Sequence, residues 1–209
     1  MSKHHKSELS AGTVSRGVPT RLYTKTGDRG FTSLYDGRRI GKQSLIFGVL
    51  GDLDELTAHI GVLCATNPDG DNTMFRGIQS DLLDIGSNIA VTDPKKKDSV
   101  PQITDEHVTR LEHCIDEIEE KNEPLTAFIL PGVRMADAQA HVCRTVARRV
   151  ERSLWRLDQC EDEESLEKKG VLELAYVQVT EPIMQYINRL SDLFFALARN
   201  LSGCAEAIK

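Results

Sequence analysis

The sequence predicts an all-α protein, a bundle of five helices that follows an irregular N-terminal segment. Apolar residues recur at helical spacing in five separate stretches of the chain, and few stretches alternate as a half-buried strand would. Short segments rich in Pro, Gly, Asn and Asp separate the five stretches. A chain of 209 residues is long enough to bury one sizeable core between these helices.

The first three predicted helices have recognisable ends. The first covers residues 46–63 and stops before "NPDGDN", and the second runs from residue 74 to about 91 and stops before "TDPKKKDSVP". The third begins at "TDEH", where Thr104 or Asp105 can accept hydrogen bonds from the free amides of the first turn. It carries the apolar pattern as far as Ile118.

Two longer helices are predicted in the C-terminal half, one over residues 135–157 and one from residue 183 to about 207. The stretch before them, "NEPLTAFILPG", has a proline near each edge and is expected to be an extended, buried connection. Between them lie a charged segment, "DQCEDEESLEKKG", and "VLELAYVQVT", whose pattern fits a strand or a helix equally well.

Composition excludes some classes of function. A net charge of -6 argues against a general nucleic-acid binder, and no apolar run approaches the length of a membrane span. Five scattered cysteines without a C-x-x-C pair indicate reduced thiols in an intracellular protein. Residues 1–20 are polar and weakly basic, so they are either a flexible tail or an organellar targeting segment ahead of a single domain over 21–209.

The segment "YTKTGDRGFTS", Tyr23 to Ser33, has the ingredients of a phosphate-binding loop, namely glycines, hydroxyls and a lysine. It is not a Walker loop, because Lys25 precedes both Gly27 and Gly30 and no apolar strand comes before them. By itself the segment fits a nucleotide-binding loop of another design or a tight turn.

The helix "HVCRTVARRVERSLWRL" places Arg144, Arg148 and Arg152 on one face, at intervals of four residues. A solvated face is the simplest interpretation of such a stripe. However, the segment contains arginine and no lysine, and forked guanidinium groups suit phosphate oxygens and buried carboxylates. A partner is therefore expected, either acids elsewhere in the protein or a bound polyanion such as a triphosphate.

The final helix adds a polar face with Asn188 and Asp192. These side chains can reach a hydrated Mg²⁺ or a ribose, or they can bond to a neighbouring helix. On the first helix, Asp54 lies among apolar residues and is a candidate buried counter-ion for one arginine.

Together these segments resemble PduO-type ATP:cob(I)alamin (corrinoid) adenosyltransferases. The resemblance covers about Leu22 to Arg199, and it is carried by five blocks in the family's order: "YTKTGDRGFTS", "DELTAHIG", "FILPG", "CRTVARRVER" and "NRLSDLFFALAR". It implies a five-helix bundle assembled as a homotrimer, with active sites between subunits. It also implies transfer of the 5'-deoxyadenosyl group of ATP to the cobalt of cob(I)alamin, with release of triphosphate.

The resemblance also assigns site residues and cofactors. ATP, with Mg²⁺, is expected at the N-terminal loop, on α-helical arginines and at one asparagine: Thr24, Lys25, Thr26, Gly27, Thr32, Lys42, Arg148, Arg149, Glu151, Arg152 and Asn188. Asp54 and Arg144 resemble an intersubunit ion pair, and with Arg148 they form the expected catalytic set. Such a reaction needs no Ser, Cys or His base, because cob(I)alamin is already a strong nucleophile.

Phe128 matches an aromatic residue that occupies the lower face of the corrin and excludes an axial ligand. From the sequence alone it would be an ordinary core residue. The cobalt-ligating motif D-x-H-x-x-G is not matched, since the nearest stretch is "DEHVTR", and His107 is interpreted as a surface histidine. Two departures from the family are "PGVRMAD", where a second glycine is usual after the proline, and the longer acidic insertion at 158–170.

A second hypothesis is a non-catalytic helical module that binds nucleotide or cobalamin and delivers the cofactor to a partner enzyme. A cobalamin reductase and an adenosylcobalamin-dependent mutase are the expected partners, and no nucleic acid or membrane is expected. A bundle with a purely structural role is the third. The expected location is the cytoplasm in a bacterium or the mitochondrion in a eukaryote.

Overall fold

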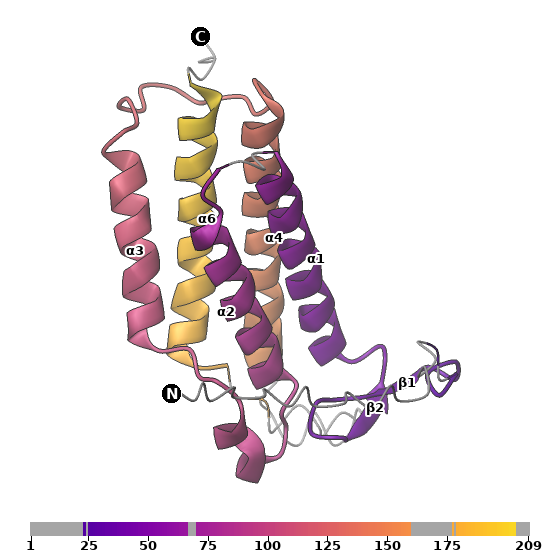
Figure 1. Ribbon diagram of the computed structural model, residues 1–209. Helices are drawn as coiled ribbons and strands as arrows, with labels where there is room; N and C mark the ends of the chain where they lie inside the picture. Colours follow the sequence, from indigo (N-terminus) through magenta and orange to yellow (C-terminus); the bar gives the residue numbers. More distant parts are fainter. Residues whose placement is uncertain (1–22, 24, 67–69, 160–176, 178, 204–209) are drawn as a thin grey trace, which may run out of the picture.

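Two long antiparallel helices, α4 and α6, form the centre of a helical bundle (Figure 1). The computed structural model describes residues 23, 25–66, 70–159, 177 and 179–203, and within them the chain is mostly helical, as predicted. α1 packs on α4, α3 packs on α6, and α2 packs on α1. The bounds are α1 Leu45–Ala65, α2 Thr73–Ile89, α3 Asp105–Glu119, α4 Met135–Asp158 and α6 Glu181–Ser202.

The core follows the apolar stripes of the helices. On α4, Val150 and Leu154 are fully buried, and on α6 Leu190 and Phe194 are fully buried against them in one cluster. The arginines of α4 lie on the other side of the helix from these side chains, so the predicted amphipathic pattern is confirmed. Burial of such stripes is the main source of stability for the bundle.

The final helix is shorter than predicted. α6 ends at Ser202 because Gly203 adopts the left-handed conformation, with φ +72°. Glycine takes this conformation without steric cost and commonly ends a helix in this way. The apolar pattern continues past Gly203 in the sequence, which is why the periodicity alone placed the end near residue 207.

A short antiparallel hairpin precedes α1 and is the main departure from the predicted irregular N-terminal loop. β1 (Phe31–Ser33) pairs with β2 (Arg39–Gly41) in the register Phe31↔Gly41. Strands of three residues are too short to show an alternating pattern, so periodicity contains no signal for them. Leu34 and Ile40 attach the hairpin to the hydrophobic core.

The connections agree with the predicted breaks, but the expected burial of the connection before α4 is wrong, because Phe128 and Leu130 are exposed. A 3-10 helix, η1 (Pro94–Ser99), lies in the break after α2, and the stretch from residue 122 to 134 is non-helical. Thr104 is the N-cap of α3, and its backbone N–H donates to His107 Nδ1 at 3.2 Å. His107 therefore serves the start of a helix.

Several predictions fall outside the residues that the structure describes. They concern the tail at 1–20, the acidic insertion beyond residue 159, and "VLELAYVQVT" except for Val177, Val179 and Thr180. The homotrimer is not tested by a single chain and stays a prediction.

Candidate functional site

The predicted nucleotide loop, which we call the glycine loop (residues 25–30), is a compact turn closed onto the hairpin. Gly30 N donates to Gly27 O at 3.2 Å, and Lys42 N donates to Gly30 O at 2.8 Å. Gly30 has φ +82°, a conformation that a residue with a side chain adopts only with strain. The loop is thus shaped by its backbone and by the end of β2.

Cationic side chains lie around the glycine loop. Arg39 Nη2 donates to Thr26 O at 2.9 Å. A Cβ atom added to Gly27 would lie only 3.2 Å from Lys42 Nζ, so the small residue allows the ammonium group to approach the backbone. Lys25 is exposed, with φ +59°. Of two further predicted nucleotide contacts, Thr32 is half-buried in β1 and Thr24 lies outside the described residues.

Arg148 and Arg152 are exposed on α4, one helical turn apart. Arg152 Nη1 donates to the backbone oxygen of Arg148 at 2.9 Å. Within the described part of the chain, neither guanidinium group has a carboxylate partner. Two adjacent cations without a counter-ion favour a bound anion at this position.

Arg149 is placed differently. Its Nε donates to Asp52 Oδ1 at 2.9 Å and its Nη2 donates to Glu55, both on α1. Ser153 Oγ also donates to Asp52, at 2.6 Å. The hydrogen bond to Glu55, together with Asp52, raises the pKa of Arg149. The counter-ions of this arginine therefore come from the protein, and they join α4 to α1.

Asp54 is exposed, so the predicted buried counter-ion within one chain is wrong. Asp52 and Glu55 are three residues apart and share a helix face, whereas Asp54 points elsewhere at about 100° per residue. Arg144 is half-buried, and its Nε donates to His141 Nδ1 at 3.4 Å. Burial and then the Arg144 charge lower the pKa of His141.

Glu151 and Asn188 link α4 to α6. Asn188 Nδ2 donates to Glu151 Oε1 at 3.0 Å, and Asn188 Oδ1 accepts from Arg189 Nη1 at 2.9 Å. Both residues line an open cavity of about 460 Å³, together with Trp155 and Arg189. The sequence left open whether Asn188 bonds to a helix or to a ligand, and in this chain it bonds to the neighbouring helix.

The connection between α3 and α4 contains the Phe128 loop (residues 125–134), which exposes apolar side chains. Phe128 itself is 87% exposed, so the interpretation of this residue as ordinary core is wrong. Leu125 and Leu130, in the same loop, are also exposed, and so is Met135 at the start of α4. An exposed apolar group of this kind indicates a binding surface.

The glycine loop and the Phe128 loop lie at opposite ends of the bundle (Figure 1). The hairpin sits near the start of α1, whereas the α3–α4 connection lies at the other end, where α6 finishes. α4 runs between these ends over 24 residues, or roughly 36 Å at 1.5 Å per residue. One chain therefore does not bring the two loops together.

The described residues contain no group of three His, Cys, Asp or Glu side chains placed to hold a metal ion. They also contain no helix long and apolar enough to cross a membrane.

Known proteins resemble this chain over nearly the whole domain. A family model described as "Cobalamin adenosyltransferase" matches residues 22–201. A cobalamin adenosyltransferase from Cupriavidus metallidurans is 36% identical over 185 residues, which are 88% of this chain and 89% of the relative. A corrinoid adenosyltransferase from Mycobacterium leprae is 38% identical over 186 residues, covering 86% of this chain and 90% of the relative.

Solved structures agree with these relatives. A variant PduO-type ATP:corrinoid adenosyltransferase from Lactobacillus reuteri, complexed with cobalamin and ATP, superposes with a TM-score of 0.74. It is 25% identical, and the match covers 90% of this chain and 99% of that chain. A second variant of that enzyme, complexed with ATP, superposes with a TM-score of 0.72 at 26% identity.

Proposed function

This chain belongs to the cobalamin adenosyltransferase family, and we propose on that basis that it transfers the 5'-deoxyadenosyl group of ATP to cob(I)alamin. The cobalt(I) electron pair forms the new bond to C5', the C5'–oxygen bond breaks, and triphosphate leaves with that bonding pair. The match of the family over residues 22–201 is the observation that carries the proposal.

The chemistry requires stabilisation of the departing triphosphate. Arg148 and Arg152 supply two permanent charges without a carboxylate partner in the described part of the chain. Lys25, Lys42 and the backbone of the glycine loop supply further donors, as Thr24, Thr26, Gly27 and Thr32 are expected to do. Preorganised positive charge of this kind lowers the barrier to loss of an anionic leaving group.

Arg149 and Asn188 were expected to contact the nucleotide directly. Arg149 is already bound to Asp52 and Glu55, so we assign it the role of fixing α4 on α1 with Arg148 facing outward. Asn188 holds Glu151 beside the cavity of about 460 Å³, where the pair can orient the nucleoside part of ATP.

We propose that the complete site forms between two copies of the chain within a homotrimer. The glycine loop and the Phe128 loop lie at opposite ends of one bundle, so a second copy must supply one of the two halves (Figure 1). The exposed Asp54 and the half-buried Arg144 are suitable partners for an ion pair across such an interface. Their role is to align the subunits on which the reaction depends.

Phe128 is proposed to cover the lower face of the corrin. Its side chain is 87% exposed and is therefore available to a ligand. An apolar ring at that face excludes water and an axial base from cobalt, and removal of that ligand makes cob(II)alamin easier to reduce.

Mg²⁺ is proposed to bind together with ATP. The described carboxylates do not converge into a set of three ligands, and Mg²⁺ is commonly held by substrate phosphates with only one or two protein carboxylates. Asp192, one helical turn after Asn188 on α6, and Glu151, which accepts a hydrogen bond from Asn188, would hold its water ligands.

The test is to mix the protein with ATP, Mg²⁺ and chemically reduced cobalamin and to follow the absorbance change to adenosylcobalamin. Formation of one triphosphate per adenosylcobalamin is expected. If folded wild-type protein gives no product but binds adenosylcobalamin tightly, the delivery module is the better assignment. If the protein binds neither ATP nor cobalamin by calorimetry, the proposed function is wrong.

A further inference from the structure

Two carboxylates outside the proposed ligand contacts share an unusual arrangement. Each accepts hydrogen bonds from three backbone amides, and each fastens one of the two loops of the proposed site. Asp36 serves the hairpin that carries the glycine loop, and Asp137 serves the Phe128 loop. In both cases burial opposes ionisation, but the amide donors outweigh it and lower the pKa of the carboxyl group.

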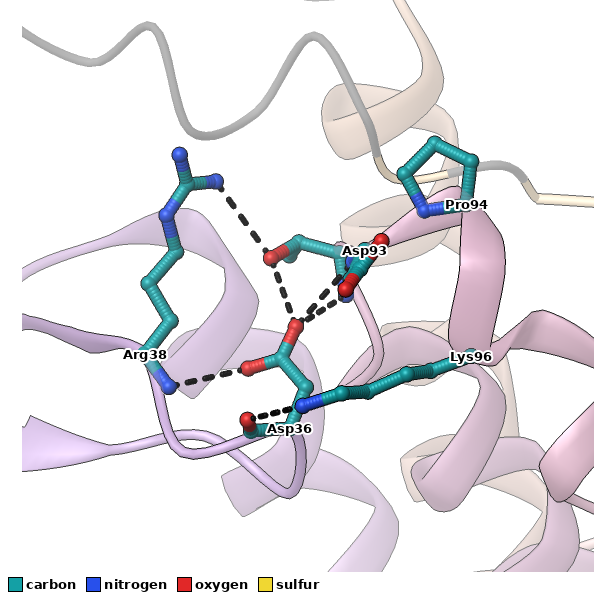
Figure 2. A pocket seen from close by; sticks show the side chains of 6 residues that line it. Asp36, Arg38, Asp93, Pro94 and Lys96 are labelled. Atoms are coloured by element: carbon teal, nitrogen blue, oxygen red, sulfur yellow. Dashed lines mark hydrogen bonds between the residues drawn. The ribbon is translucent and has the colours of Figure 1, made fainter.

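Asp36 joins the β1–β2 turn to the segment that follows α2 (Figure 2). Its Oδ2 accepts from Thr92 N at 2.9 Å, from Thr92 Oγ1 at 2.9 Å and from Asp93 N at 3.1 Å. Its Oδ1 accepts from Arg38 N at 3.0 Å, and Lys96 Nζ donates to the backbone oxygen of Asp36 at 2.8 Å. The hairpin turn is thereby tied to a distant part of the chain.

Asp137 acts within the first turn of α4. Its Oδ2 accepts from Gly132 N at 2.9 Å and from Val133 N at 3.3 Å, and its other oxygen accepts from Arg134 N. The residue is only 1% exposed. Gly132 has φ +108°, a conformation that favours glycine, and the amides of residues 132–134 all point toward the carboxylate.

Both loops need hydrogen bonds of this kind to hold their conformation. A two-stranded hairpin is marginally stable in water by itself, and this one touches the core mainly through Leu34 and Ile40. The Phe128 loop holds apolar side chains away from the bundle, although burying them would be favourable by about 25 cal/mol per Å². Three hydrogen bonds to the buried Asp137 carboxylate oppose that collapse, since a buried carboxylate that loses its donors is costly.

We propose that Asp36 and Asp137 are positioning residues of the adenosyltransferase, Asp36 for the nucleotide half of the site and Asp137 for the corrinoid half. This inference rests on the proposed function.

The test compares Asp36→Asn with Asp137→Asn. Asparagine has the same shape as aspartate but only one acceptor oxygen. Its NH₂ group replaces the second oxygen, so it faces a backbone N–H donor and cannot accept a hydrogen bond from it. Asp137→Asn should raise the KM for cobalamin roughly five- to tenfold and leave the KM for ATP within about twofold. It should also reduce the spectroscopic signal of cob(II)alamin that lacks its lower axial ligand. Asp36→Asn should raise the KM for ATP and spare the signal at saturating ATP.

Asp71→Asn is the matched control. Asp71 Oδ1 accepts from Thr73 N at 2.9 Å at the start of α2, so the same chemical change is made at a carboxylate that belongs to neither loop. Both KM values should stay at the wild-type level. The proposal is overturned if Asp36→Asn and Asp137→Asn change the two KM values equally, or if neither variant differs from the control.

Amide hydrogen exchange separates this inference from the proposed function. Exchange at residues 132–134 should be about tenfold faster in Asp137→Asn, and exchange at residues 92–93 should be faster in Asp36→Asn, whatever the activity. If exchange is unchanged in both variants, Asp36 and Asp137 do not hold the two loops. If the wild-type protein has no turnover but the two variants show the expected faster exchange, the proposed function is wrong. The role of Asp36 and Asp137 in holding the two loops is then still supported.

Discussion

Arg148 and Arg149 are neighbours in the sequence, and the structure assigns them different tasks. We expect Arg148→Ala to lose activity while keeping its stability, and Arg149→Ala to lose stability first. The reason is that Arg149 is paired with Asp52 and Glu55, whereas Arg148 has no carboxylate partner among the described residues. The two variants remove the same side chain, so each is the control for the other.

The magnitude for Arg149→Ala follows from its contacts. Its side chain is 40% exposed and that of Asp52 is 20% exposed, so the pair is only partly screened by water. An exposed ion pair contributes up to about 1 kcal/mol, and the lost hydrogen bond to Asp52 adds roughly 1 kcal/mol. A total of about 1–2 kcal/mol corresponds to a fall in Tm of roughly 2–8 °C for a chain of this size.

For Arg148→Ala we expect a change in unfolding free energy within about 0.5 kcal/mol, because the side chain is exposed and makes no ion pair with the described residues. Its kcat/KM should fall roughly 100-fold, equivalent to about 2.7 kcal/mol of transition-state stabilisation. Thermal unfolding at one fixed protein concentration and steady-state kinetics with varied ATP measure both effects.

A double-mutant cycle with Asp52→Ala and Arg149→Ala tests the assignment directly. We expect a coupling free energy of about 0.5–1 kcal/mol in stability. If Arg149→Ala instead keeps the wild-type Tm and loses ATP affinity as strongly as Arg148→Ala, the Arg149 side chain leaves Asp52 to bind phosphate, and its assignment to the contact between α4 and α1 is wrong.

The other predictions concern Phe128, the proposed intersubunit ion pair and Asp137. Phe128→Ala should keep turnover when cob(I)alamin is supplied and lose it about tenfold or more when the assay starts from cob(II)alamin and a weak reductant; equal losses in both assays would reduce Phe128 to a packing role. Asp54→Arg and Arg144→Asp should each weaken the trimer in analytical ultracentrifugation, and the double variant should restore it, whereas no rescue would exclude the ion pair. Because the folded-state pKa of Asp137 lies below the unfolded value of about 3.9, its contribution to stability is complete above that pH and is lost as pH falls through the folded pKa. The Tm difference between wild type and Asp137→Asn should therefore shrink below about pH 4, and a difference that is unchanged at pH 3 would contradict this.

The helix α4 shows how much of the site could be predicted from the sequence. Its period, its apolar side and its bounds near residues 135 and 157 were predicted correctly, because helix geometry alone determines which side chains share a face. The choice between a solvated stripe, internal counter-ions and a polyanion remained open. It depended on which residues of α1 face α4, and among the described residues Arg149 has carboxylate partners while Arg148 and Arg152 do not.

The wrong predictions have local causes. The β1–β2 hairpin was not predicted because its strands have three residues each. Asp54 was predicted to be the internal counter-ion, whereas Asp52 and Glu55 pair with Arg149, because neither spacing nor composition shows which side of α1 meets α4. Asp137 had a recognisable signal, because it is an acidic residue three positions after the N-cap residue Arg134. Its hydrogen bonds to the amides of residues 132–134 depend on the local backbone conformation, including φ +108° at Gly132.

The amino-acid sequence by itself determined the helical segments, the family and the residue types that suit a triphosphate and a corrinoid, since these follow from periodicity and from ordered motifs. Only the tertiary structure decided which charges are already neutralised, that Phe128 is exposed, and that the two loops stand at opposite ends of the bundle (Figure 1). The physical reason is that pairing, burial and distance between segments far apart in the chain are set by how helices pack, and packing is not encoded in any single stretch of residues.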